Sequence, residues 1–147
     1  MLRMLSLTLV VAVASVLSVG ISAAGASTKF AYTEQVADTA DLVVSFEEGS
    51  LKRFASVDYQ LAATAVSISC SAGQCIGSLH NLSATVTLTP DTERGRVTGT
   101  LSLDIPTSPA PCGCSGTFHV EYTDVTLTNL TTGHVYRLDS ISRDWTT

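Results

Sequence analysis

Four cysteines in two close pairs are the residues of this 147-residue chain whose spacing most directly suggests chemistry. Four residues separate Cys70 from Cys75, and one residue separates Cys112 from Cys114. Such pairs can form two disulfides, bind zinc or act as a redox dithiol. The spacings lack the two-residue gap of a zinc knuckle, and the segment 105–118 has no Lys, Arg or His that would activate a thiolate before residue 119. We therefore expect structural disulfides and no metal or other cofactor.

The connectivity of these disulfides has three formal solutions. Pairing within each close pair would leave one tight ring that spans a single residue, with the strain that such a ring implies. The two cross-pairings would instead attach the segment 106–116 to the turn 71–74. Each would close a loop of about forty residues, worth roughly 3–4 kcal/mol in the chain-entropy model. We favour cross-pairing over pairing within each close pair.

The segment 106–116 is the longest turn-rich stretch after the N-terminal region, and it holds three of the four prolines. Proline fixes φ and lacks an N–H, so this segment is not a central strand. A long, stiff connection on a β scaffold is a common place for a binding site. The candidate binding residues in this segment and in the nearby turn are Pro109, Pro111, Gly113 and Gln74.

Catalytic signatures are missing from the sequence. It contains neither a Gly-x-Ser-x-Gly nor a His-Glu-x-x-His motif. The three histidines, at positions 80, 119 and 134, are expected to be solvated, as is the carboxylate pair Glu47 and Glu48 in a turn. A Ser/His/Asp site can assemble in space from distant residues and stays open as an alternative. The sequence favours a non-catalytic protein.

The first 26 residues have the organisation of a secretory signal peptide. Arg3 gives a positive start, residues 5–21 are uncharged and largely apolar, and Ala24-Gly25-Ala26 ends the segment as a cleavage signal. We expect cleavage after Ala26, which leaves one secreted β domain at residues 27–147 in an extracellular, periplasmic or cell-envelope location. An uncleaved membrane anchor is the alternative.

The charge balance limits the classes of partner. Eight Lys and Arg against thirteen Asp and Glu give a formal charge of −5. Nucleic acids and anionic membranes need clustered cations, so neither is an expected partner. The expected partner is an extracellular protein or a small ligand, and the oligomeric state is undetermined.

Alternation of apolar and polar residues predicts an all-β domain. Residues 42–46 alternate cleanly, and residues 82–88 and 97–105 are predicted to pair as a hairpin around a turn at 90–95. With about seven short strands and no helical pattern, we expect one antiparallel β-sandwich, immunoglobulin-like or similar. A small β-barrel is the alternative.

Other segments interrupt or end this pattern. The alternation changes phase at residues 62–65 and again between 122 and 125, as it does at a β-bulge or a strand corner. Residues 30–36 are predicted to pair as an edge strand or to lie loosely over one end. A last strand is expected over residues 135–141, and Trp145 follows it.

Two Asn-x-Ser/Thr triplets, at Asn81 and Asn129, match the acceptor pattern for N-glycosylation. Asn81 is expected at the start of a strand. Asn129 leads into a predicted turn, where a glycan would be tolerated. The sequence does not decide whether either residue is modified.

The leading hypothesis from the sequence is a binding module that uses segment 106–116 and the turn 71–74. One alternative is a small barrel that carries an apolar ligand or acts as a modest enzyme, with a cavity left by small residues. Those small residues are Ala63, Ala65, Ala84 and Gly99. Another alternative is a protease inhibitor that presents the proline-rich segment.

Overall fold

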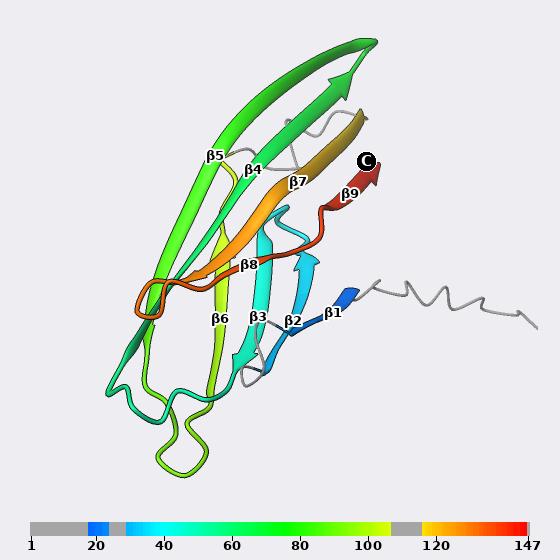
Figure 1. Ribbon diagram of the computed structural model, residues 1–147. Coiled ribbons are helices and arrows are strands. Elements are labelled where there is room, and N and C mark those ends of the chain that lie inside the picture. Colours follow the sequence, from blue (N-terminus) through cyan, green and yellow to red (C-terminus); the bar gives the residue numbers. More distant parts are fainter. Residues whose placement is uncertain (1–17, 24–28, 107–115, 147) are drawn as a thin grey trace, which may run out of the picture.

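The computed structural model describes residues 18–23, 29–106 and 116–146, and in this part the protein is all-β (Figure 1). Two antiparallel sheets pack face to face and do not close on each other, so the predicted β-sandwich is confirmed and the barrel is wrong. The strands are β1 (Ser18–Ala23), β2 (Lys29–Val36), β3 (Leu42–Glu48), β4 (Val57–Ser71), β5 (Gln74–Leu88), β6 (Val97–Leu103), β7 (Gly116–Asn129), β8 (Val135–Arg137) and β9 (Ile141–Thr146).

The two sheets differ in length and in order. The first has the order β1-β2-β3-β6, and the second has the order β5-β4-β7-β8, with β9 also paired to β7. Strands β4 and β5 have fifteen residues each, whereas β3 and β6 have seven. Figure 1 shows the upper ends of β4 and β5 extending past the first sheet.

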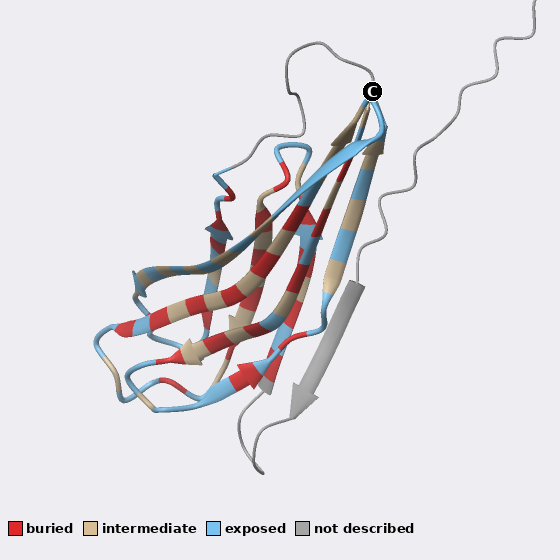
Figure 2. Cartoon of the chain, turned by 90° about the horizontal axis from the view of Figure 1, so that it is seen from above, coloured by how far each residue is buried: buried red, intermediate tan, exposed pale blue. Residues whose placement is uncertain are grey.

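Buried residues alternate with less buried ones along β3, β4 and β7, as the bands in Figure 2 show. On β3 the residues Leu42, Val44 and Phe46 are buried, as their alternation predicts. Aromatic rings join the two sheets: Phe30 stacks on Tyr136 with ring centroids 3.8 Å apart, and Phe46 lies 4.7 Å from Tyr59.

The predicted hairpin of residues 82–88 and 97–105 is wrong. Both segments are strands, but β5 pairs along its whole length with β4, and β6 pairs with β3 in the other sheet. The connection at residues 90–95 therefore passes from one sheet to the other. Matched lengths around a turn predicted local pairing, but each strand has a longer or better-placed partner elsewhere in the chain.

The two predicted changes of phase have different outcomes. On β4 there is none: every second residue from Val57 to Ser67 is buried, and the register with β5 is continuous. A change of phase at residues 62–65 would have turned Val66 and Ile68 toward the core, but both lie on the opposite parity, and Ile68 is exposed. On β7 the phase change is confirmed, because its register with β4 shifts between Ala62 and Thr64, and Asp124 there has a positive φ of 51°.

The first and last strands contain more pairing than the sequence predicted. Residues 29–36 form a regular strand, β2, between β1 and β3. The expected last strand is two strands, β8 and β9, that both pair with β7. On β9, Trp145 packs against Phe118 with ring centroids 5.4 Å apart.

Candidate functional site

The end of the β4–β5 hairpin is the candidate site, and we call residues 66–79 the hairpin tip. Its turn has two central residues, Ala72 and Gly73, with φ angles of 50° and 77°. Positive φ at both positions is the type I′ geometry that matches the twist of a two-residue hairpin, and Gly73 adopts it without a steric penalty. The tip is therefore a regular continuation of the sheet rather than a loose loop.

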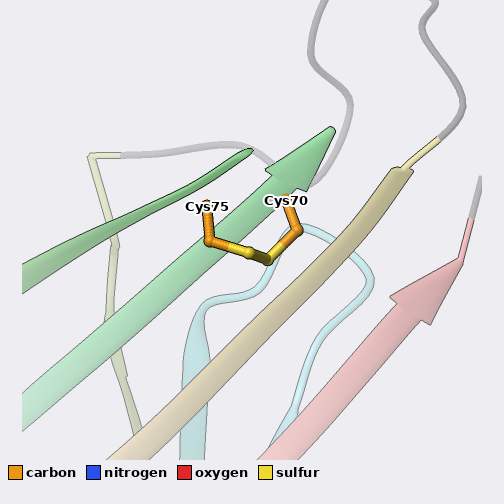
Figure 3. The surroundings of a disulfide bond; sticks show 2 residues. All are labelled: Cys70 and Cys75. Atoms are coloured by element: carbon orange, nitrogen blue, oxygen red, sulfur yellow. A yellow bond between two sulfur atoms is a disulfide. The ribbon is translucent and has the colours of Figure 1, made fainter. Parts of the chain in front are cut away.

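A disulfide between Cys70 and Cys75 closes the hairpin tip (Figure 3). The two residues are directly opposite in the β4–β5 register, with Cα atoms 4.0 Å apart. The preferred cross-pairing with Cys112 or Cys114 is therefore wrong. The two-residue turn of the hairpin determines the disulfide connectivity, because it places Cys70 and Cys75 directly opposite each other without a contribution from a distant segment. Cys112 and Cys114 lie outside the described residues.

This pairing predicts a modest contribution of the disulfide to stability. Closing so short a loop is worth about 2 kcal/mol in the chain-entropy model, against about 4 kcal/mol for a loop of forty residues. The double variant Cys70→Ser/Cys75→Ser should lower the free energy of unfolding by no more than about 2 kcal/mol in urea titrations. Non-reducing peptide mapping should recover the Cys70–Cys75 link. A link from either residue to the segment 106–116 would contradict the structure.

Exposed apolar side chains gather at the hairpin tip. Ile76 is 74% exposed, Leu79 is 67% exposed and Ile68 is 37% exposed. The other large exposed apolar residues of the described part, Leu130 and Val135, lie around the β7–β8 connection. Ile76 has the parity of the inner face of its sheet, and Leu79 and Ile68 have the outer parity. Both faces of the tip are thus apolar.

The structure describes only one of the four predicted contact residues. Gln74 lies at the exposed tip beside the disulfide, as expected. Pro109, Pro111 and Gly113 lie outside the described residues. The apolar residues of the tip were missed because apolar character was taken as a sign of burial. A signal was present: residues 59–90 contain no Asp, Glu, Lys or Arg.

The three histidines lie apart from one another. His119 Nδ1 lies 2.7 Å from Asp144 Oδ1 on the outer face, and His134 is exposed at the β7–β8 turn. His80 is inside β5, and its buried Nε2 has no hydrogen-bond partner in the described part of the chain. A catalytic triad needs a hydroxyl or thiol beside the histidine as well as a carboxylate, and in the described part of the chain the side-chain contact of His119 is with Asp144.

Two kinds of feature were not found in the part of the chain that the structure describes. The described residues contain no group of three or more His, Cys, Asp or Glu side chains that could hold a metal ion. They also contain no helix long and apolar enough to cross a membrane.

The core contains a fully buried carboxylate, Glu48, which the sequence analysis placed in a solvated turn. Its Oε2 accepts hydrogen bonds from the hydroxyl of Tyr59 at 2.7 Å and from Nδ2 of Asn129 at 3.0 Å. Its Oε1 accepts one from the hydroxyl of Tyr136 at 2.6 Å. Burial, followed by the hydrogen bond to Glu48, raises the pKa of both tyrosines. This cluster joins β3 to three strands of the other sheet and is closed to a substrate.

The burial of Asn129 also corrects the glycan prediction. Its side chain is fully buried, and its Oδ1 accepts hydrogen bonds from the backbone N–H groups of Thr131 and Thr132. Nδ2 lies 3.0 Å from Oε2 of Glu48 inside the core, so the folded protein has no room for a glycan on it. Asn81, by contrast, is exposed on β5.

A second buried carboxylate, Glu34 on β2, has neither oxygen in a hydrogen bond. Burial, with a smaller effect from the nearby carboxylate of Asp139, raises its pKa from 4.5 to about 7. Asp139 itself accepts a hydrogen bond of 3.2 Å from the hydroxyl of Tyr32. Glu34 faces the space between the sheets, where it lacks the partner that buried charges normally have.

The small residues proposed to line a ligand cavity are packed. Ala65 is fully buried, and Ala63 nearly so. A Cβ added at Gly99 would lie 2.5 Å from Cδ1 of Leu88 and 2.9 Å from Cζ of Phe46, so the space beside this glycine is filled. These residues give no support to an apolar-ligand carrier.

Comparison of the chain with known protein families, curated proteins and solved structures gives no match. The function is therefore argued from the geometry of the chain itself.

Proposed function

We propose that this chain is an exported, disulfide-stabilised β-sandwich that acts by binding a protein partner through its hairpin tip. The observation that carries the proposal is the exposure of Ile76, Leu79 and Ile68 around the Cys70–Cys75 disulfide. Large apolar side chains exposed together on both faces of one hairpin end are uncommon on soluble proteins unless they serve an interaction. The disulfide fixes their arrangement before a partner arrives, which reduces the entropy lost on binding.

The charge pattern supports a protein partner. The centres of protein interfaces are depleted of charged residues, and the hairpin tip lies within the charge-free stretch 59–90 of a chain that is otherwise acidic. A nucleic acid would require the opposite pattern of clustered Lys and Arg.

Export rests on the signal-peptide pattern of residues 1–26, and two features are consistent with it. A structural disulfide is typical of oxidising compartments. Cleavage after Ala26 would remove β1 and make β2 the edge of its sheet. Inward-pointing charged residues are one device by which natural edge strands avoid aggregation, and Glu34 on β2 fits that role.

Photo-crosslinking in the producing cells tests the function. A benzophenone amino acid at position 76 should give a discrete crosslinked product with a protein, and the same amino acid at position 135 should give none. Both positions are well exposed, at 74% and 55%, but they lie on different strands at different ends of the second sheet.

The specificity of that product is tested with Leu79→Ser, which changes an exposed neighbour without touching position 76. Specific binding predicts loss of the product in this background. Equal products from positions 76 and 135, or a product unaffected by Leu79→Ser, would overturn the proposed contact surface.

A further inference from the structure

The free edge of β5 carries an inference that rests on the proposed function and names its partner. Strand β5 is the outer strand of its sheet and pairs only with β4 among the described strands. Its register with β4 is continuous over fifteen residues, so no bulge interrupts it. Nor does it contain a proline or any Asp, Glu, Lys or Arg. A long, regular, uncharged edge is the type that accepts another strand.

The other edge strands of the described sheets are short or charged, and β1 has only six residues. Strand β8 carries Arg137, and β9 carries Arg143 and Asp144. The uncharged β6 has seven residues and is flanked by Arg96 and Asp104. Short edges and charged side chains are the usual defences against strand addition. Strand β5 has neither of these defences.

The direction of the backbone groups can be derived from the turn. In a two-residue hairpin the flanking residues, Ser71 and Gln74, form a hydrogen-bonded pair, so the next pair is non-hydrogen-bonded. The short Cα–Cα distance of 4.0 Å between Cys70 and Cys75 agrees with that assignment. On β5 the N–H and C=O groups of Cys75, Gly77 and Leu79 therefore point to the free edge.

We propose that the partner is a second copy of this chain, which pairs its own β5 antiparallel along this edge. Antiparallel pairing of identical strands is two-fold symmetric and brings each residue near its own copy. Any charge on the strand would then meet a like charge, and the chain is acidic, with a formal charge of −5. β5 is free of that repulsion over its full length.

The two-fold pairing also covers exposed apolar surface. In the register that sets Gly77 opposite its own copy, residues 74–80 of the two β5 strands pair, and their outward-pointing groups face one another. Leu79 of each chain then lies opposite Cys75 of the other, beside the disulfide. The exposed Ile76 comes to lie opposite Ser78 on the inner face. The dimer would have one continuous sheet across the two domains.

Sedimentation of purified protein with a matched pair of variants tests this pairing. Gly77→Pro removes an N–H that points to the free edge and leaves the bonds to β4 intact. Gly77→Ala keeps that N–H, and its Cβ would have no neighbour closer than the Ser67 carbonyl at 3.9 Å. We expect a wild-type dimer, a dimer constant unchanged by Gly77→Ala, and one weakened at least about tenfold by Gly77→Pro.

A second pair of variants guards against misfolding of Gly77→Pro. Leu79→Lys places a charge at the proposed interface, and Leu130→Lys places one on a similarly exposed site near the β7–β8 turn. Only Leu79→Lys should weaken the dimer. A monomeric wild type, or a dimer insensitive to both Gly77→Pro and Leu79→Lys, would overturn self-pairing. A crosslink from position 76 to a different protein would also overturn self-pairing, but it would support the proposed function. If position 76 gave no crosslinked product at all, both self-pairing and the proposed function would be overturned.

Discussion

Glu48→Ala should lower the free energy of unfolding by about 3–5 kcal/mol, a large share of the stability of a domain this size. The variant removes the common acceptor of Tyr59, Tyr136 and Asn129. Each donor would then be buried without a partner, at a cost of about 1–3 kcal/mol for an unsatisfied group. Urea unfolding followed by circular dichroism measures the loss.

Glu47→Ala is the matched control for this variant. Glu47 is the preceding residue on β3, is half-exposed on the opposite face, and forms a 3.2 Å ion pair with Arg96. Exposed ion pairs contribute little, so its loss should cost less than about 1 kcal/mol. Should Glu48→Ala fail to fold, Glu48→Gln keeps one acceptor oxygen and should cost about 1–3 kcal/mol. Equal costs for the two positions would contradict the role of the cluster.

The strands could be predicted from the sequence because alternation is a local property. Leu42, Val44 and Phe46 identified a strand and its buried face correctly. The pairing of the strands could not be predicted, because it depends on competition among partner strands that are distant in the sequence. Residues 82–88 and 97–105 form strands of the expected kind, but β4 offers β5 fifteen paired positions. A hairpin between residues 82–88 and 97–105 would offer fewer paired positions, so the pairing of β5 with β4 is favoured.

The candidate site was partly predictable. The turn 71–74 and its cysteines were recognised from their composition. The alternation rule equates apolar residues with the buried face, but Ile68 lies on the outer face of β4, which the first sheet does not cover. Ile76 has the inner parity and is exposed because the hairpin tip extends past the end of the first sheet. The length of a facing sheet is a property of the whole fold.

The burial of Glu34 and Glu48 was not anticipated for a different reason. Both lie on the inward parity of their strands, at positions where alternation predicts apolar side chains. The expectation that charges are solvated overrode the pattern. For Glu48 three donors compensate the burial. For Glu34 none does, and that difference has a measurable consequence.

Glu34→Gln should stabilise the protein above neutral pH and leave its stability nearly unchanged at pH 4. In the folded chain the pKa of Glu34 is raised to about 7, mainly by burial, whereas the unfolded chain has the ordinary value near 4.5. Between these values the folded state binds more protons, so the free energy of unfolding falls as pH rises. The full loss, reached above pH 7, is up to about 3 kcal/mol.

The charged groups around Glu34 determine how this experiment is interpreted. Asp139 adds to the shift, and the hydroxyl of Tyr32 is already donated to Asp139. The guanidinium of Arg143 is held by the carbonyl of Val36 and the carboxylate of Asp38. Asp139→Asn should therefore reduce the pH dependence only in part, because burial is the larger cause. The difference in unfolding free energy between wild type and Glu34→Gln isolates this titration from all others. A difference that stays constant from pH 4 to pH 8 would show that Glu34 is ionised in the folded protein with a partner that compensates it.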